Sequence, residues 1–384
     1  MARMSRKTML IGAVAALALL GALAAGFVLL RPQPTDAWEF IGPNRTEIWT
    51  LAFDPTTPTT LYAGTGDGVY KSEDGGVTWR IAGSGLSPRS LVVDPATPTT
   101  LYAGEYSRLY SREGELRDEW RGVLKSEDGG ATWRVMNNGL GERPEVDALA
   151  LDPMNSQIVY AGTRRGIYRS DDGGANWRLI EPTGLVSTLV IDPMSPTTLY
   201  AGGSWRGVLK SEDGGATWRQ ISDDLDRASV RALLIDPANP RVIFAGTDAG
   251  VYQSEDGGET WRAVNDGLPE AADNGLPEGV GQDERRVTAL FIDPSGVMYA
   301  NVSDDIYRRA EREWRKVEVA VPAPRADVEG MFRLLAVDPR TPATLYVAVS
   351  YRDGISYLDG GLFRSADGGV TWQPIELAQA PSIP

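Results

Sequence analysis

From Trp38 onward, short apolar runs alternate with polar turns, and the same arrangement returns seven times along the chain. The first unit contains the runs Leu51–Phe53, Leu61–Ala63 and Val69–Tyr70 and closes on Trp79, with Asp-Pro, Gly and Gly-Gly turns between the runs. Short runs rich in Leu, Val, Ile, Tyr and Trp and bounded by Gly and Pro are typical of β-strands. We therefore expect four short strands in each unit.

Two anchors mark every unit, an Asp-Pro pair near its start and a Trp near its end. The anchor residues are Asp54, Asp94, Asp152, Asp192, Asp236, Asp293 and Asp338, and Trp79, Trp133, Trp177, Trp218, Trp261, Trp314 and Trp372. Successive Asp-Pro pairs are 40 to 58 residues apart, which is the blade period of a β-propeller. The runs are apolar throughout, as expected when both faces of a sheet pack on neighbours. The sequence thus predicts an all-β fold, a seven-bladed β-propeller with four-stranded blades, whose closure hides the sheet edges.

The N-terminus has a different pattern, because the 23 residues from Thr8 to Leu30 contain no charge and follow Arg3, Arg6 and Lys7. A helix of about 20 apolar residues crosses a bilayer, and its basic flank stays in the cytoplasm. We expect five parts: a cytoplasmic basic tail (1–7), one N-terminal transmembrane signal-anchor helix (8–30), a linker (31–37), the propeller (38–377) and a C-terminal tail (378–384).

This arrangement predicts a single-pass protein of the cell membrane with its propeller on the extracytoplasmic side. Cleavage after the small residues Ala22-Leu23-Ala24 is the alternative. The apolar run continues past that point to Leu30, which favours an uncleaved anchor.

Composition narrows the possible chemistry. The net charge of −14 disfavours binding to a nucleic-acid backbone. The chain has no Cys and no His, which excludes disulfides, thiolate nucleophiles, a Ser-His-Asp triad and ordinary zinc sites. We expect neither a metal nor a cofactor.

The motif Ser-x-Asp-Gly-Gly-x-(Thr/Asn)-Trp closes six of the units, and its aspartates are Asp74, Asp128, Asp172, Asp213, Asp256 and Asp367. It resembles the Asp-box, or BNR, repeat of sialidase-like propellers, and the resemblance covers Trp38 to Ile375. The sixth unit, with Arg308 to Trp314, lacks the Asp-Gly-Gly turn and is expected to be a blade with a shortened hairpin. Asp accepts hydrogen bonds from its own turn and paired Gly supplies positive φ, so we assign these aspartates a structural role. Each box has too few carboxylates for a calcium loop.

Inserted length falls on one rim of the predicted ring, in the second-to-third strand connections and between blades. Insertions confined to one face of a repeat array mark a binding face. The aromatic and arginine residues on these loops form our candidate binding surface: Tyr106, Arg108, Tyr110, Arg112, Trp120, Arg121, Trp205, Arg206, Tyr351 and Arg352. The alternative is that the loops simply pack on one another.

A second candidate lies five residues before each Asp-Pro pair, at the same rim. These positions hold Trp49, Arg89, Asp147, Ser187, Arg231, Thr288 and Arg333. The three arginines Arg89, Arg231 and Arg333 form a possible anion patch at the pore mouth, suited to a carboxylate or phosphate. Ion pairs with rim acids such as Asp147 are the alternative use of these arginines.

The chain looks most like the photosystem II stability/assembly factor family, in its size, single seven-bladed ring, exported location and membrane tether. That resemblance implies a non-catalytic scaffold that binds a membrane-protein or protein-complex partner through its long-loop face, without nucleic acid. The blade-to-blade uniformity also favours a scaffold over an enzyme.

The alternative function is a carbohydrate-binding or glycoside-hydrolase propeller of the sialidase-like kind. A glycosidase needs a pair of carboxylates, for which Glu105, Glu113, Asp248 and Asp353 are candidates, with nothing in the sequence that singles out a pair.

Overall fold

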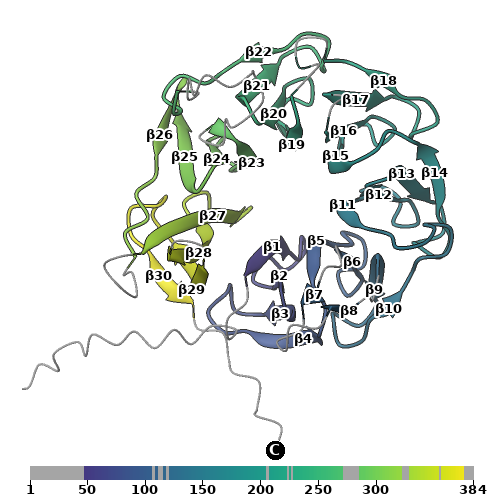
Figure 1. The fold of residues 1–384 in the computed structure, drawn as a ribbon, viewed down its shortest axis with the longest axis horizontal. Coiled ribbons are helices and arrows are strands. Elements are labelled where there is room, and N and C mark those ends of the chain that lie inside the picture. The colour runs from purple at the N-terminus through teal and green to yellow at the C-terminus, as the bar shows by residue number, and fades with distance from the viewer. Residues whose placement is uncertain are drawn as a thin grey trace, which may run out of the picture. The chain divides into compact units, whose positions relative to one another are not determined.

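The computed structural model describes residues 47–105, 109–110, 116–117, 121–204, 207–222, 225, 228–270, 285–321, 328–353 and 356–375. These residues form seven four-stranded antiparallel sheets around a central opening (Figure 1). The predicted seven-bladed, all-β propeller is confirmed. Within the described residues, no helix is long and apolar enough to cross a membrane, and the transmembrane helix expected at 8–30 lies outside them.

Each blade follows chain order from its inner to its outer strand, and Figure 1 places the first strand of every blade beside the central opening. Blades 1 to 4 are built from β1 (Ile48–Phe53), β2 (Leu61–Thr65), β3 (Gly68–Ser72) and β4 (Arg80–Ser84); β5 (Pro88–Val93), β6 (Leu101–Glu105), β9 (Val123–Ser126) and β10 (Arg134–Val135); β11 (Val146–Leu151), β12 (Val159–Thr163), β13 (Gly166–Ser170) and β14 (Arg178–Glu181); and β15 (Val186–Ile191), β16 (Leu199–Gly203), β17 (Val208–Ser211) and β18 (Arg219–Gln220).

Blades 5 to 7 are built from β19 (Val230–Ile235), β20 (Ile243–Thr247), β21 (Gly250–Ser254) and β22 (Arg262–Ala263); β23 (Val287–Ile292), β24 (Met298–Val302), β25 (Asp305–Ala310) and β26 (Glu313–Lys316); and β27 (Glu329–Val337), β28 (Leu345–Asp353), β29 (Ser356–Ser365) and β30 (Gln373–Ile375). A separate hairpin of β7 (Leu109–Tyr110) and β8 (Leu116–Arg117) lies in the second-blade insert. The sixth blade keeps its strands without an Asp box, as expected, and its shortened hairpin turns at Glu311 with a positive φ of 60°.

The second strand of each blade forms the densest part of the core. All five residues of β2, β6, β12, β20 and β24 are buried. The next blade packs so closely on this strand that a Cβ at Gly246 would lie 2.6 Å from Val287 Cγ1. Blade 6 has Asn301 at the corresponding position, and its buried side-chain amide donates to Leu334 O and accepts from Leu334 N–H, both at 2.9 Å. Blade 7 is therefore held to blade 6 by a polar clamp.

The two rims of the ring carry different connections. Ile48 pairs with Thr65, so each first strand begins beside the second-to-third connection of its blade, at what we call the mouth rim. The Asp boxes lie at the opposite end of the blades, the hairpin rim. The second-blade insert closes at the mouth rim, where Glu105 N–H donates to Gly122 O at 2.8 Å. In blade 7 the inserted length extends β28 and β29 beyond Ala348, to the pair Asp353 and Ser356. Both inserts thus share the predicted rim.

Candidate functional site at the channel mouth

In six blades, a β-bulge in the first strand redirects one side chain of that strand. The cross-strand register skips one residue in each of these strands, and the skipped residues are Trp49, Arg89, Asp147, Ser187, Arg231 and Thr288. A bulged residue leaves the ladder and its side chain is redirected, which is why bulges are common beside binding sites. In blade 7 the skipped residue is Leu335, and Arg333 instead pairs regularly with Ala348.

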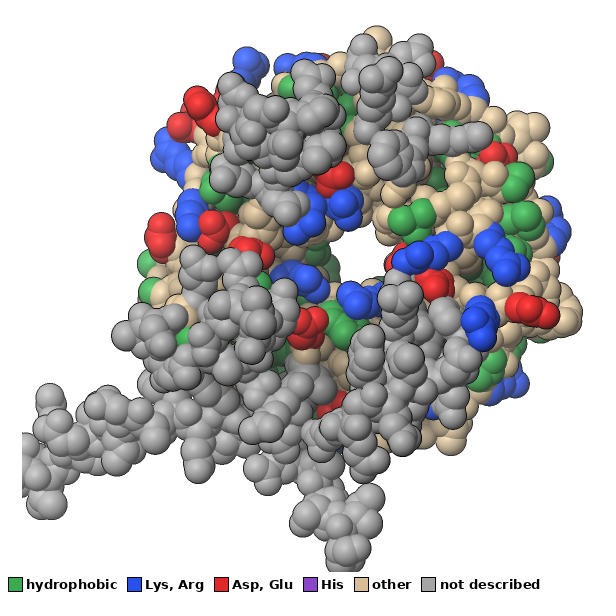
Figure 2. All heavy atoms as spheres, viewed as in Figure 1, with side chains coloured by type: hydrophobic (Ala, Val, Ile, Leu, Met, Phe, Trp, Pro, Cys, Tyr) green, Lys and Arg blue, Asp and Glu red, His purple; other side chains and the backbone are tan. Residues whose placement is uncertain are grey.

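These seven positions line one open cavity of about 740 Å³ at the mouth of the central channel. Its other lining residues are Thr50, Leu51, Arg164, Leu185, Ala289, Phe291, Asn301, Leu334 and Leu335. The cavity brings together the three arginines of the predicted anion patch, and Figure 2 shows Lys and Arg side chains around the opening of this face. The offset from the Asp-Pro pairs thus located the lining of a real cavity.

A fourth arginine, Arg164, was not among the predicted mouth residues. It belongs to the turn between β12 and β13, where Thr163-Arg164-Arg165-Gly166 corresponds to Thr65-Gly66-Asp67-Gly68 of the first blade. Comparing these turns between blades would have found it, since they lie at the same rim as the starts of the first strands.

The four arginines have different surroundings. The Arg89 guanidinium lies over the Trp49 indole, with Cζ 4.2 Å from the ring centroid. Arg231 forms an ion pair with Asp248, whose Oδ1 lies 2.5 Å from Nε. Arg164 forms an ion pair with Glu145. Arg333 is exposed and has no ion-pair partner among the described residues. Rim acids therefore compensate part of the patch, as the alternative interpretation proposed.

Asp147 is the single carboxylate among the lining residues. Burial raises its pKa, Glu145 adds to that effect, and Arg164 and Arg89 oppose it. Its Oδ2 is buried without a hydrogen-bond partner in the described structure. The charged form of a buried carboxylate is penalised, which is the main cause of the raised pKa of Asp147.

Of the four carboxylates considered for glycoside hydrolysis, the structure describes the side chains of Glu105 and Asp248, and neither lines the mouth cavity. Glu105 is 1% exposed and accepts a hydrogen bond from Ser87 N–H at 2.6 Å, so it braces the start of the second-blade insert. Asp248 is engaged by Arg231. Glu113 and the side chain of Asp353 lie outside what the structure describes.

Most of the predicted long-loop surface also lies outside the described residues. These positions are Tyr106, Arg108, Arg112, Trp120, Trp205 and Arg206, together with the side chains of Tyr110 and Arg352. Arg121 donates from Nη1 to Gly85 O at 2.9 Å and so joins the insert to blade 1. Tyr351 was expected at the surface but is buried. It is 1% exposed in the extended hairpin of blade 7, and burial raises its pKa to about 12.

The Asp boxes form closed hydrogen-bonded turns. In the fourth blade, Asp213 Oδ1 accepts from Ser211 Oγ and Thr217 N–H, both at 2.8 Å, and Asp213 Oδ2 accepts from Thr217 Oγ1 at 2.6 Å. These bonds hold the pKa of Asp213 at about 2. The same contacts recur in the boxes of Asp74, Asp128, Asp172, Asp256 and Asp367. Each box therefore uses its carboxylate internally, and no group of acids suited to a metal ion occurs among the described residues.

Comparison with known proteins finds similar folds among solved structures. No family model matches the chain, and no curated protein matches its sequence. The GH74 enzyme of Niastella koreensis has a similar structure, with a TM-score of 0.55 and 19% identity over 85% of this chain and 59% of that one. YCF48 bound to a D1 peptide gives a TM-score of 0.48 and 16% identity over 90% of this chain and 85% of that one. YCF48 from Cyanidioschyzon merolae gives a TM-score of 0.49 and 17% identity over 74% of this chain and 84% of that one. The chain spans about three-fifths of the Niastella enzyme, and at this identity the likeness shows the fold alone.

Proposed function

We propose that this protein is a non-catalytic propeller scaffold that binds a protein partner through its mouth rim, with the channel mouth taking acidic groups of that partner. The observation that carries the proposal is the cavity itself, into which separate blades send Arg89, Arg164, Arg231 and Arg333. Guanidinium groups bind carboxylates through paired hydrogen bonds and favour acidic partners over basic ones.

The same cavity supports binding over hydrolysis. Glycoside hydrolysis uses two carboxylates about 5 to 9.5 Å apart. Asp147 is the one carboxylate among the lining residues, so a catalytic pair would need a second acid from outside this set. The Arg89–Trp49 stack adds an aromatic surface of the kind that dominates protein interfaces.

The location is part of the proposal. The uncharged run from Thr8 to Leu30 and its basic flank support a single-pass anchor in the cell membrane, with the propeller on the extracytoplasmic side. Such an anchor keeps the propeller at the membrane, which favours a partner in or at the membrane. Resistance of the protein to alkaline extraction, together with protease access to the propeller from the outer side only, is the expected result.

The main test is crosslinking and co-purification from native membranes with three variants. The first carries Arg89→Gln and Arg333→Gln, the second replaces residues 106–120 with Gly-Asp-Gly and keeps Glu105, and the control carries Arg315→Gln. Arg315 is an exposed arginine on the outer strand of blade 6, so the control removes an arginine charge away from the mouth.

We expect one defined membrane protein to co-purify with wild type and with the control, and to be lost with the mouth variant. Retention of that protein by the mouth variant would overturn the role of the arginines. Turnover in a glycoside hydrolysis panel, abolished by Asp147→Asn, would replace the scaffold with the carbohydrate-active alternative.

A further inference from the structure

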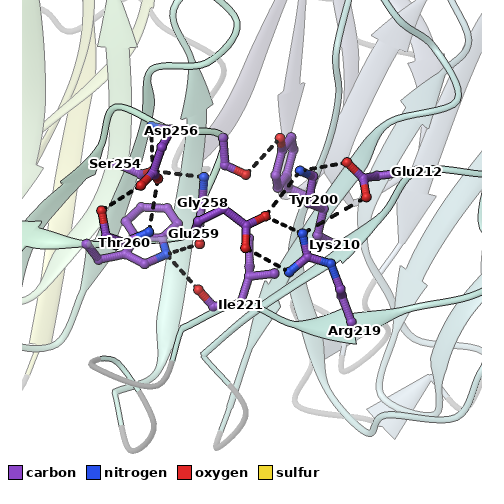
Figure 3. Close-up of polar contacts among 12 residues, drawn as sticks. Tyr200, Lys210, Glu212, Arg219, Ile221, Ser254, Asp256, Gly258, Glu259 and Thr260 are labelled. Carbon is purple, nitrogen blue, oxygen red and sulfur yellow. Dashed lines mark hydrogen bonds and ion pairs between the residues drawn. The ribbon is translucent and has the colours of Figure 1, made fainter.

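The junction between blades 4 and 5 shows how charges are matched across this ring. Lys210 and Arg219 of blade 4 face two acids, Glu212 of their own blade and Glu259 of the fifth-blade Asp box (Figure 3). Lys210 Nζ lies 2.9 Å from Glu212 Oε1, and Arg219 Nη1 lies 3.3 Å from Glu259 Oε2. The hydrogen bond with Glu259 raises the pKa of Arg219. Cations of one blade thus meet an acid of the next.

At the following junction, between blades 5 and 6, the cations of one blade do not meet an acid of the next in this way among the described residues. Arg262 follows Trp261 as Arg219 follows Trp218, so it occupies the corresponding place on blade 5. Blade 6 has no Asp box. Its Arg309 pairs with Met298 as Ser254 pairs with Ile243, so an arginine stands where six other units bury a serine. Burial lowers the pKa of Arg309. The charges of the neighbouring Arg262 and Arg312 lower it further, whereas the charge of Asp266 raises it. Trp314 N–H donates to Asp266 O and Trp314 Nε1 donates to Val264 O, both at 2.7 Å, so the segment that begins at Arg262 packs on the hairpin that carries Arg309 and Arg312.

The positive charge of this cluster is only partly compensated. Arg262 forms an ion pair with Glu255 of its own blade. Arg309 and Arg312 have no ion-pair partner among the described residues, and Arg309 Nε is buried without a hydrogen bond. The Arg309 guanidinium lies 5.9 Å from the centroid of the Trp314 ring, which supports one of its faces. A half-buried cation without a partner is costly, and a bound anion would remove that cost.

We propose that Arg309 and Arg312, with Arg262 beside them, form a binding site for a phosphate group at the junction of blades 5 and 6. The two unpartnered guanidinium groups carry two charges, which a phosphate monoester dianion neutralises, and their donor geometry fits phosphate oxygens. The site lies toward the hairpin rim, opposite the mouth, and is independent of the partner proposed above. The phosphate can come from a soluble ester or from a phospholipid headgroup.

Isothermal titration calorimetry of the full-length chain in a mild detergent tests the site with three probes: inorganic phosphate, glycerol 1-phosphate and glycerophosphoglycerol. The titrations use the Arg89→Gln, Arg333→Gln background, so that two mouth arginines do not contribute. We expect saturable binding that weakens about tenfold or more when Arg309→Ser and Arg312→Gln are added, because each charge-assisted contact is lost. The control Arg315→Gln, in the same hairpin but paired with Glu313, should leave the affinity unchanged.

The probes distinguish the two sources. Binding of inorganic phosphate and glycerol 1-phosphate alone assigns a soluble phosphate, whereas equal or tighter binding of the diester glycerophosphoglycerol assigns a lipid headgroup. Arg309→Ser restores the residue of the other blades, and Arg312→Gln alters an exposed turn, so the single Arg312→Gln variant decides the matter if the double variant does not fold. Absence of saturable binding to the starting protein, or equal affinity in the Arg312→Gln variant, would overturn the proposal.

Discussion

A single aspartate in each Asp box accepts hydrogen bonds from two residues of its own turn, and this makes the boxes sensitive to acid. The pKa of Asp213 is held at about 2, below its ordinary 3.8, by Thr217 and Ser211. A carboxyl with a lowered folded pKa contributes stability above its unfolded pKa, and the contribution is lost as pH falls through the folded pKa. We predict that Asp213→Asn lowers the melting temperature at neutral pH and weakens its dependence on pH between 3.8 and about 2, as measured by thermal unfolding at several pH values. An unchanged slope in that interval would contradict the structural role of the box.

The pKa of Asp147 is shifted upward, so its effect on the pH dependence of stability is opposite to that of Asp213. Burial raises the pKa of Asp147, so its contribution to stability is fully present below the ordinary value of 3.8 and is lost as pH rises through the folded pKa. We predict that Asp147→Asn raises the melting temperature at neutral pH, with a gain that shrinks toward pH 4. The variant should also bind the acidic partner more tightly, since a like charge is gone. A lower melting temperature at neutral pH would mean that attraction to Arg89 and Arg164 outweighs burial.

At the residue scale, local chemistry was predictable from the sequence and long-range placement was not. The box of Asp213 closes within the seven residues from Ser211 to Thr217, so its turn could be inferred from the motif alone. The mouth positions could also be inferred, because they repeat at a constant offset from each Asp-Pro pair. The burial of Tyr351 could not, since it depends on how far β28 and β29 extend, which no repeat unit encodes.

At the element scale, a tyrosine of the second strand connects each of several blades to the Asp box of the next. Tyr102 donates to Gly173 O at 2.9 Å and Tyr160 donates to Gly214 O at 3.0 Å. Blade 5 has Phe244 at this position, and it faces blade 6, which has no box glycine to accept a hydrogen bond. The loss of the box and the loss of the hydroxyl thus go together across one junction.

This pairing predicts that two opposite substitutions both destabilise the protein. Tyr160→Phe should destabilise the protein by about 1 kcal/mol, because one intramolecular hydrogen bond is lost. Phe244→Tyr should also destabilise it, by about 1–3 kcal/mol, because a buried hydroxyl gains no acceptor. Chemical denaturation of both variants measures the two values. Stabilisation by Phe244→Tyr would show that blade 6 offers an acceptor after all.

The strands themselves were predictable from the apolar runs, their turns and the repeat period. The β-bulges of the first strands were not, because the bulged residues, such as Trp49, Arg89 and Ser187, share no side-chain type. A bulge follows from how the first strand meets the second, which is a property of the packed blade. The sequence could therefore place the mouth residues in a row without showing why they point into the channel.

At the scale of the whole molecule, the ring closes by packing blade 7 against blade 1. Tyr346 donates to Gly75 O at 2.9 Å, although the two residues are 271 positions apart, and its ring meets Phe53 edge to face at 5.8 Å. Ile48, Leu51 and Trp79 share one apolar cluster with Leu335 and Ile375. Closure thus repeats the contacts of an internal junction across a very large separation in sequence, where loop-closure entropy opposes it most.

The closure contact predicts where the ring opens first. Tyr346→Ala and Tyr160→Ala remove the same fully buried side chain, so both should destabilise the protein by about 3–5 kcal/mol. A short connection keeps blades 3 and 4 together after Tyr160→Ala, whereas blades 7 and 1 can separate after Tyr346→Ala. Hydrogen exchange should therefore accelerate in both β1 and β27 with Tyr346→Ala, and stay near wild type in these strands with Tyr160→Ala. Equal protection of β1 and β27 in the two variants would mean that closure does not limit opening, and that the ring loosens at every junction together.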